Sequence, residues 1–411
     1  MAADTTYVIV GASLAGAKAA ETLRAEGFDG RLVMIGAESE RPYERPPLSK
    51  DYLLGKAERD TIYVHPAQWY AEHEVDLRLG VAATGLDPAG HEVTLADGSR
   101  VGYTKLLLTT GSSPRRLPAP GADLDGVLYL RSVQDSDRLR AAFAGASRVA
   151  VVGGGWIGLE TAAAARSAGA EVTVLEAAEL PLLRVLGREV AEVFASLHRD
   201  HGVDVRTGVQ VAEITGAGGR ADGVLLGDGS RVSADVVVVG VGITPNIQLA
   251  AQAGVKVENG VMVDQRLRSS DPDIYAAGDV ACAFHPLLRR HIRVEHWANA
   301  LNQPLIAARA MLGQDVAYDR VPYFYTDQYD LGMEYSGYVD PGGYDRVVFR
   351  GDVPGREFLA FWVGGGRVLA GMNVNIWDVN DQIAALVRSG KPVEAARLAD
   401  PDVPLEALAG G

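Results

Sequence analysis

Apolar residues gather in short unbroken runs, and each run is followed by a small-residue turn and a segment with helical spacing. The first run, TYVIV (6–10), predicts a buried strand, residues 14–27 predict a helix, and RLVMIG (31–36) predicts the next strand. The same order returns as a strand at 148–152, a helix at 156–168 and a strand at 171–175. Continuous apolar strands separated by helices favour parallel sheets that are covered on both faces.

The repeat extends beyond these strands and helices. A segment with hairpin character at 94–103 follows the first copy, and a matching hairpin at 222–242 follows the second. From about residue 323 the pattern changes to aromatic residues, short strands and a last helix at 378–389, which predicts an α+β domain. We expect the final residues, ADPDVPLEALAGG, to form a surface tail.

Each copy carries a glycine-rich turn between its first strand and its helix. Gly11 and Gly16 frame the first turn, with Ser13 in place of the usual middle glycine. The second turn has all three glycines of the G-x-G-x-x-G pattern, namely Gly153, Gly155 and Gly158. Such a turn lets the N-terminus of the helix present free N–H groups to a pyrophosphate. A tight turn that binds no ligand is the alternative for either motif taken alone.

An acidic residue follows the second strand of each copy. Glu38 and Glu176 are positioned to accept hydrogen bonds from a ribose. A carboxylate at Glu176 would repel the 2′-phosphate of NADP, so we expect NADH rather than NADPH. The neighbouring Arg184 is either a further cofactor contact or a solvated arginine.

Two dinucleotide sites in one chain make sense if one holds a flavin and the other delivers a hydride to it. Nicotinamide gives up two electrons together, whereas a flavin accepts the pair and releases the electrons singly. The sequence therefore predicts an α/β fold with two doubly wound Rossmann-like dinucleotide-binding domains plus a C-terminal α+β domain. The expected cofactors are FAD and NAD(H).

Composition narrows this interpretation. The 411 residues carry a formal net charge of −14, which argues against nonspecific nucleic-acid binding. Cys282 is the single cysteine, so an intrachain disulfide, a CxxC redox centre and a cysteine-rich metal site are excluded; we expect a buried, inert thiol. His285, His291 and His296 lack the spacing of metal ligands, and we predict no metal site.

The sequence also bears on location. The longest apolar run, VVVVGVGI (236–243), is too short to cross a bilayer, and residues 1–13 lack the pattern of a secretory signal. We therefore expect a cytoplasmic protein with no membrane partner.

From residue 6 to beyond 380, the chain resembles the FAD-dependent NADH–ferredoxin reductases of the pyridine nucleotide–disulfide reductase superfamily, which include the putidaredoxin and rubredoxin reductases. The motifs that carry the resemblance are VIVGASLAG, RPYERPPLSK, LLLTTGSSPR, VVGGGWIGLE, GVGITPN, DIYAAGDVA, EHWANALNQ and PYFYTDQYDLGMEYSG. Jointly these motifs are highly specific. They depart from the family pattern at Ser13, and at Tyr325, where relatives often carry tryptophan.

The resemblance implies site residues for both cofactors. For FAD it implies Gly11, Ser13, Leu14, Ala15, Gly16, Glu38, Arg45, Pro46, Lys50, Thr110, Gly111, Arg131, Gly278, Asp279, Glu295, His296 and Trp297. For NAD it implies Gly153, Gly155, Trp156, Ile157, Gly158, Glu160, Glu176, Arg184 and Gly242.

The resemblance also implies two catalytic residues. Lys50 is placed near the flavin N5 edge and Glu160 near the nicotinamide, and the two side chains could pair. Such a pair would balance charge as the flavin becomes anionic on reduction. An ordinary helix-surface ion pair is the alternative.

The missing cysteines decide the subfamily. Disulfide-reducing members need a cysteine pair beside the flavin and peroxide-reducing members need one cysteine, but the corresponding stretch RPYERPPLSK has none. The segment HPLLRRHIR (285–293) carries three arginines, and is either a basic patch that docks an acidic ferredoxin or a solvated loop.

The predicted organisation is an FAD domain (1–110 and 245–322), an NAD domain (111–244) and a C-terminal domain (323–411). The predicted activity passes electrons from NADH through FAD to a [2Fe–2S] ferredoxin, which serves an oxygenase or a cytochrome monooxygenase. The alternatives are a rubredoxin reductase or NADH oxidase, and a redox-sensing flavoprotein similar to apoptosis-inducing factor.

Overall fold

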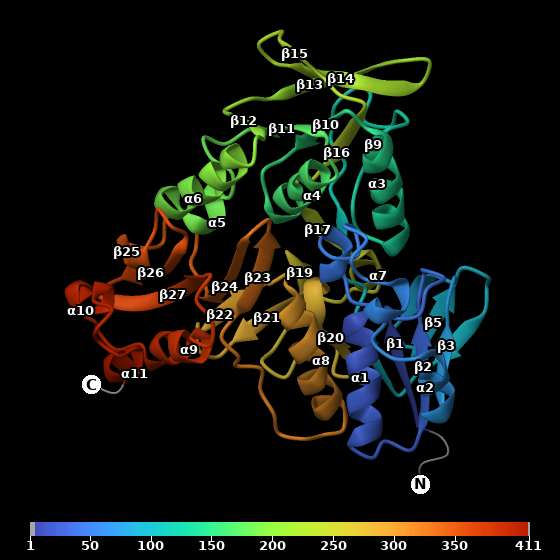
Figure 1. Ribbon diagram of the computed structural model, residues 1–411. Helices are drawn as coiled ribbons and strands as arrows, with labels where there is room; N and C mark the ends of the chain where they lie inside the picture. The colour runs from blue at the N-terminus through green and yellow to red at the C-terminus, as the bar shows by residue number, and fades with distance from the viewer. Residues whose placement is uncertain (1–4, 410–411) are drawn as a thin grey trace. The chain divides into compact units, whose positions relative to one another are not determined.

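The computed structural model describes residues 5–409, which form two compact units (Figure 1). The first unit consists of residues up to Glu44, Arg59–Ser113 and Thr244–Pro322. The second unit consists of Arg45–Glu58, Pro114–Ile243 and the residues from Tyr323 onward. The chain passes from one unit to the other after residues 44, 58, 113, 243 and 322. Two of these crossings lie within the short strands β8 (Ser112–Pro114) and β17 (Ile243–Pro245).

The first unit is built on a parallel five-stranded sheet with β1 at its centre. In spatial order its strands are β20 (Ile274–Ala276), β7 (Lys105–Leu108), β1 (Thr6–Val10), β2 (Arg31–Ile35) and β3 (Val75–Arg78). Strands β1, β2, β7 and β20 are buried apart from the first residue of the first three, whereas the edge strand β3 is only partly buried. The helices are α1 (Leu14–Ala25), α2 (Ala67–Glu72), α7 (Gln248–Gln252) and α8 (Trp297–Met311).

Two smaller sheets complete the first unit. One is an antiparallel sheet of β4 (Ala83–Asp87), β5 (Glu92–Leu95) and β6 (Arg100–Gly102). The other has the order β18 (Val257–Glu258), β19 (Gly260–Val263), β21 (Ala281–His285) and β22 (Arg290–Ile292). Short 3₁₀ turns occur at η2 (Arg59–Ile62) and η3 (Gly278–Val280).

The second unit repeats the parallel sheet. Its strands in spatial order are β12 (Asp204–Thr207), β11 (Glu171–Glu176), β10 (Arg148–Val152), β16 (Val236–Val239) and β9 (Val127–Leu128). Its helices are α3 (Val133–Gly145), α4 (Trp156–Ser167), α5 (Leu183–Leu186) and α6 (Arg188–Asp200). An antiparallel sheet of β13 (Val211–Ala217), β14 (Arg220–Leu226) and β15 (Arg231–Ser233) follows, and the 3₁₀ turn η1 (Pro46–Ser49) belongs to the same unit.

The C-terminal part of the second unit is an antiparallel sheet with helices on it. The strand order is β23 (Tyr323–Gln328), β24 (Leu331–Gly337), β27 (Arg367–Val374), β26 (Glu357–Gly364) and β25 (Arg346–Asp352). Fully buried Trp362 donates its indole N–H to the Leu186 carbonyl at 2.9 Å, so this sheet shares one core with α5 and α6. The helices are α9 (Asn380–Ser389), α10 (Ala395–Ala399) and α11 (Leu405–Ala409).

The expected fold class is confirmed: both doubly wound parallel sheets and the C-terminal sheet are present. Two local expectations were wrong. The segment 222–242 is a hairpin only as far as residue 233, since 236–239 forms β16, a central parallel strand beside β10. The expected surface tail contains α11, whose Leu405 and Leu408 are buried; residues 410 and 411 lie outside the described residues.

The strand orders locate the candidate sites. In the first unit the chain runs from β1 to β2 on one side, and later returns to β7 on the other side of β1. In the second unit β10, β11 and β16 repeat this arrangement. Ligands of doubly wound sheets bind at the carboxyl end of the strand where the order reverses, which here means the turns after β1 and β10.

Candidate functional site

The first glycine turn brings helix α1 close to strand β1. Gly11 has a φ of 125°, which an L side chain rarely adopts. A Cβ atom on Gly16 would lie 2.1 Å from the carbonyl oxygen of Gly11, so the helix can start here only without a side chain. Ser13 is the N-cap residue in an extended conformation, and buried Leu14 and Ala15 begin the helix.

The second glycine turn repeats this geometry. Gly153 has a φ of 101°, and a Cβ atom on Gly158 would lie 2.0 Å from the Gly153 carbonyl oxygen. Gly155 differs, because a Cβ there would meet its nearest neighbour, the Gly240 carbonyl oxygen, at 4.0 Å. Internal packing therefore does not require a glycine at 155, whereas close approach of a ligand to this backbone would.

Both turns have the donor set that a pyrophosphate needs. At the start of α1 the side chain of the N-cap residue Ser13 accepts no hydrogen bond from the first turn, and at the start of α4 the N-cap residue Gly155 has no side chain. Neither first turn holds an acidic residue. By contrast, Ser132 and Asp135 form a capping box on α3. The N-terminal amides of α1 and α4 therefore face the glycine turns without a side-chain acceptor, and this arrangement fits a dinucleotide at each turn.

The two acidic residues after β2 and β11 have different surroundings. Glu38 accepts a hydrogen bond from the Tyr43 hydroxyl. Glu176 accepts from the backbone N–H of Gly154 at 2.6 Å through Oε2, and from that of Ala178 at 2.7 Å through Oε1. Glu176 thus lies directly beside the glycine turn and is oriented by two amides, as a ribose acceptor at that position requires.

The loop after β7 contacts the segments that return to the first unit. Thr110 Oγ1 donates to the Asn246 carbonyl at 2.8 Å, and the Gly111 carbonyl accepts from the Asn246 N–H at 2.9 Å. Ser112 donates to Asp279 Oδ2 at 2.7 Å. Gly278, in the same turn as Asp279, has a φ of 80°, and a Cβ there would lie 3.3 Å from the Ala15 side chain at the start of α1. The structure therefore brings Asp279 close to the first glycine turn.

Three further predicted FAD residues lie at the start of α8. Glu295 accepts a hydrogen bond from Arg293 at 2.7 Å. His296 is the N-cap residue, and burial lowers its pKa to about 4, so its ring is neutral at physiological pH. Trp297 is the first residue of the helix.

The remaining predicted FAD residues lie in the second unit. Arg45 and Pro46 open the 3₁₀ turn η1, which ends at Ser49, and Lys50 follows it. Arg45 donates to the carbonyl oxygen of Arg131, just before α3. The RPPLSK stretch is thereby attached to α3, and this attachment is reinforced by the Ser136 hydroxyl, which donates to the Leu48 carbonyl at 2.8 Å.

Lys50 and Glu160 form a buried ion pair. The Lys50 Nζ lies 2.8 Å from Glu160 Oε1, and the exposed fractions of the two side chains are 14% and 4%. The predicted pair is therefore present, and it is not the exposed helix-surface pair of the alternative. Glu160 also accepts hydrogen bonds from Ser49 Oγ and, at 2.5 Å, from Thr326 Oγ1.

Ser49 and Thr326 were missed by the sequence reasoning. Ser49 adjoins Lys50 in the motif, but Thr326 is 166 residues away from Glu160 in the chain. The sequence feature that could have identified Thr326 is its place in the strand YFYTDQ. Every second residue of this strand, namely Phe324, Thr326 and Gln328, is buried between more exposed neighbours.

The other residues predicted to bind NAD differ in burial and in contacts. Trp156 opens α4 and packs its ring against Phe194 and Phe324, whereas Ile157 is exposed. Arg184 is exposed on α5. Gly242 is exposed after β16, and its carbonyl accepts from the Arg115 N–H at 2.9 Å.

The segment 285–293 separates into inward and outward parts. His285 is buried and its Nε2 lies 2.8 Å from the Arg320 carbonyl oxygen. Arg293 is bonded to Asn259 and Glu295, and its side chain is 9% exposed. Arg289 and Arg290 are exposed, so a basic patch here rests on two arginines rather than three.

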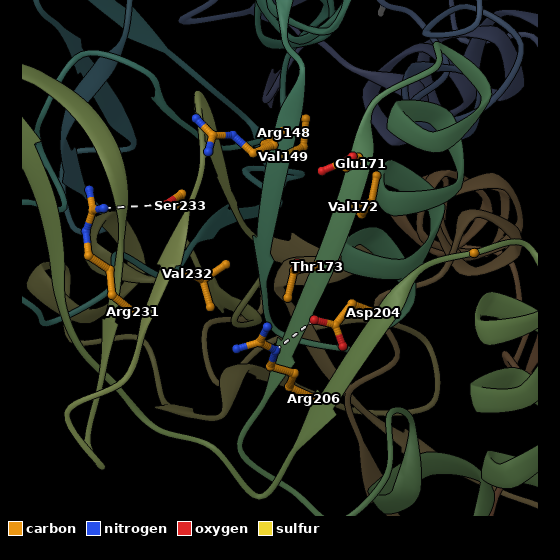
Figure 2. A pocket seen from close by; sticks show the side chains of 11 residues that line it. Arg148, Val149, Glu171, Val172, Thr173, Asp204, Arg206, Arg231, Val232 and Ser233 are labelled. Atoms are coloured by element: carbon orange, nitrogen blue, oxygen red, sulfur yellow. Dashed lines mark hydrogen bonds and ion pairs between the residues drawn. The ribbon is translucent and has the colours of Figure 1, made fainter.

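A pocket of about 520 Å³ lies in the second unit but away from the glycine turn. Figure 2 shows its lining, where Arg206 pairs with Asp204 at 2.8 Å. Arg148 and Glu171 are the first residues of β10 and β11, whereas Gly153 and Glu176 lie at the carboxyl ends of those strands. The pocket is therefore at the opposite edge of the parallel sheet from the candidate cofactor site.

Within residues 5–409, no helix is long and apolar enough to cross a membrane. In the same range, no group of three or more His, Cys, Asp or Glu side chains is arranged to hold a metal ion.

Comparisons with known proteins agree with this geometry. The chain is 42% identical to the ferredoxin–NAD(+) reductase component of the anthranilate 1,2-dioxygenase system of Burkholderia cepacia, over 99% of each chain. It is 38% identical to putidaredoxin reductase of Pseudomonas putida, over 99% of this chain and 97% of the relative. The crystal structure of the covalent putidaredoxin reductase–putidaredoxin complex matches with a TM-score of 0.95 and 36% identity, over 99% of this chain and 98% of that one.

Family models divide the chain at the point where its pattern changes. A model of the pyridine nucleotide-disulphide oxidoreductases matches residues 5–303, and a reductase C-terminal model matches residues 323–409. The expected family is confirmed. The chain belongs to the pyridine nucleotide-disulphide oxidoreductase family, in its branch with a reductase C-terminal domain, and is an oxidoreductase.

Proposed function

We propose that this chain is an FAD-dependent ferredoxin reductase that passes electrons from NADH to a [2Fe–2S] ferredoxin, which then serves an oxygenase or a cytochrome monooxygenase. The observation that carries the proposal is the pair of matching glycine turns, each at the reversal point of a parallel sheet and each opening a helix without a side-chain acceptor. The names of the relatives from Burkholderia and Pseudomonas support the choice of a ferredoxin as the acceptor.

The first turn is the proposed FAD site. Amides at the start of α1 would bind the pyrophosphate, Glu38 a ribose hydroxyl and Asp279 the ribityl chain. The contacts implied by the resemblance through Arg45, Pro46, Arg131, Thr110, Gly111, Gly278, Glu295, His296 and Trp297 belong to the same proposal. When bound, FAD accepts an electron pair and releases electrons one at a time.

The second turn is the proposed NADH site. Amides at the start of α4 would bind the pyrophosphate, and Glu176 would accept from the adenosine ribose. The two backbone amides at Glu176 hold its carboxylate in place, where it would repel a 2′-phosphate. Trp156, Ile157, Arg184 and Gly242 are the further residues assigned to this site.

Lys50 and Glu160 are the proposed catalytic pair. A buried ammonium paired with a carboxylate presents a fixed, net-neutral charge arrangement, and it needs no rearrangement when a neighbouring ring gains charge. Three hydrogen-bonded neighbours hold Glu160, so the position of the Lys50 ammonium is defined by the protein.

The proposal also covers organisation, docking and location. The three functional domains are proposed as 1–110 with 245–322 for FAD, 111–244 for NAD and 323–411 as the C-terminal domain. Exposed Arg289 and Arg290 are the proposed contacts for an acidic ferredoxin. The proposed location is the cytoplasm.

A comparison of electron acceptors tests the function. The purified holoenzyme is supplied with NADH or NADPH and, in separate reactions, with a [2Fe–2S] ferredoxin, rubredoxin or oxygen. We expect the highest kcat/KM with NADH and the ferredoxin, and a ferredoxin rate that falls as salt increases. An equal or faster rate with rubredoxin or oxygen would favour the rival enzymes. A stable NADH complex without turnover would favour the redox-sensing protein.

A further inference from the structure

Strand β23 presents alternate side chains to the helices of the second unit. Phe324, Thr326 and Gln328 are buried, and the residues between them are more exposed. Phe324 packs on Trp156 with ring centroids 5.2 Å apart, so this face of the strand lies against α4. An apolar strand face would be sufficient for packing, yet two of the three buried positions are polar.

The polar side chains continue inward from the ion pair. Gln328 Nε2 lies 3.2 Å from Thr326 Oγ1, and Gln328 Oε1 lies 2.8 Å from His198 Nε2. His198 is fully buried on α6, and the Tyr329 hydroxyl lies 3.4 Å from its Nδ1. A continuous series of contacts therefore joins Glu160 on α4 to His198 on α6 by way of β23.

The Glu160 carboxylate at the end of this series determines which group donates and which accepts in each of its hydrogen bonds. An ionised carboxylate accepts only, so Thr326 must donate to Glu160 and must accept from the Gln328 amide N–H. The amide oxygen then faces His198, which must carry its proton on Nε2 and accept from Tyr329 on Nδ1. Burial lowers the pKa of His198 to about 4, which agrees with this neutral form.

We propose that Thr326, Gln328 and His198 are positioning residues that act through Glu160, holding its carboxylate in one orientation and aimed at the Lys50 ammonium. The donors of the series all point toward Glu160, and aligned hydrogen bonds strengthen one another. The inference rests on the proposed function, because the pair matters to catalysis only if it influences the bound flavin.

The series orients charge but does not conduct protons. A proton relay needs each member to give up one proton while it gains another, and the amide N–H of Gln328 is not an acid at physiological pH. A chain built for relay would have a hydroxyl, a histidine or water at that position. The Gln328 amide donates on one side and accepts on the other, so it keeps the hydrogen bonds of the series in one direction without transferring a proton.

The test uses the midpoint potential of the bound flavin together with the rate of its reduction at saturating NADH. Thr326→Val keeps the shape of the side chain but removes the donor. It should shift the potential in the same direction as Glu160→Gln and slow the reduction about tenfold, with the Kd for NADH unchanged. Thr326→Ser should restore both quantities.

The controls separate positioning from general damage to the sheet. Ser336→Ala removes a buried hydroxyl from β24 of the same sheet, where Ser336 bonds Asn380 and not the pair, so it should leave the potential at the parental value. In the Glu160→Gln background the carboxylate is already gone, so adding Thr326→Val should shift the potential no further.

The outcomes distinguish this inference from the proposed function. If Glu160→Gln shifts the potential but Thr326→Val does not, or if the two shifts add in the double variant, the positioning role is wrong and the function stands. If Glu160→Gln itself leaves the potential unchanged, the assignment of the pair to the flavin fails and the inference falls with it.

Discussion

The two glycine turns share one backbone geometry and differ in what surrounds it. In each turn the last glycine lies close to the carbonyl oxygen of the first glycine. A Cβ atom on Gly16 would lie 2.1 Å from the Gly11 oxygen, and one on Gly158 would lie 2.0 Å from the Gly153 oxygen. The middle residue is Ser13 in one turn and Gly155 in the other, and the acidic partner is held by a tyrosine hydroxyl in one and by two amides in the other. If the proposed function holds, this difference assigns the position of the pyrophosphate to the turn and the choice of dinucleotide to the residues around it.

The largest effects should come from adding a methyl group at the last glycine of each turn. Gly16→Ala and Gly158→Ala each place a Cβ against a backbone carbonyl that cannot move freely, and should destabilise that unit by about 3 kcal/mol. Gly16→Ala should lose FAD. Gly158→Ala should retain FAD but lose its reduction by NADH. FAD absorbance after desalting, and bleaching by NADH, measure the two outcomes. If Gly158→Ala lost FAD and Gly16→Ala retained it, the assignment of the two turns to FAD and NADH would have to be reversed.

Each unit contains a histidine whose pKa is strongly lowered by burial, and this similarity predicts an acid sensitivity. Burial lowers the pKa of His198 and of His296 from 6.5 to about 4. Because the unfolded chain binds these protons more readily, the fold loses stability as pH falls from about 6.5 towards 4, by about 3 kcal/mol for each histidine.

Urea unfolding at pH 7 and pH 4 measures this loss. His198→Asn should reduce the difference between the two pH values, whereas His291→Asn at an exposed position should not. Equal pH dependence in the parent and both variants would contradict a neutral buried His198.

An intermediate effect should follow from changing the acidic residue of the second turn. Glu176→Arg removes the carboxylate that accepts hydrogen bonds from the Gly154 and Ala178 amides. It also introduces a positive charge that can pair with the 2′-phosphate of NADPH. We expect kcat/KM to fall about 30-fold with NADH and to rise with NADPH. Glu171→Arg at the opposite end of β11 is the matched control and should change neither. An unchanged NADH preference in Glu176→Arg would remove its role in specificity.

The smallest effects should come from exchanging the middle residues of the turns. Ser13 caps no amide with its side chain and its backbone is already extended, so Ser13→Gly should change the Kd for FAD by less than about threefold. At Gly155 a Cβ meets open space within the protein, so Gly155→Ser should raise the KM for NADH without lowering the unfolding temperature. A lowered unfolding temperature in Gly155→Ser would mean that packing, and not a ligand, requires this glycine.

Local patterns were sufficient for the elements around each turn. The apolar runs and the glycines predicted β1, α1 and β2, and their counterparts β10, α4 and β11, to within about two residues at each end, because each is specified by its own segment. Strand β16 was misread as part of a hairpin, since its parallel pairing with β10 depends on residues far away in the chain.

The candidate site was predictable only in part for the same reason. Lys50 and Glu160 were identified through motifs, and the structure shows their bond. Thr326 and Gln328 lie within the motif PYFYTDQYDLGMEYSG, which gave them no role, and His198 lies outside every motif. The hydrogen bonds that join them connect three separate elements, α4, β23 and α6. Polar residues at the buried positions of an alternating strand were the available signal, but the pattern alone does not say which helix covers that face.

Anaerobic stopped-flow mixing tests the central claim most directly, namely that one chain joins a two-electron donor to a one-electron acceptor through two dinucleotide sites. The FAD-loaded protein is mixed first with NADH, then with an oxidised [2Fe–2S] ferredoxin, and the flavin absorbance is followed. The account predicts fast bleaching with NADH, slower bleaching with NADPH, and recovery of absorbance that requires ferredoxin. A reduced flavin that ferredoxin cannot reoxidise would contradict it.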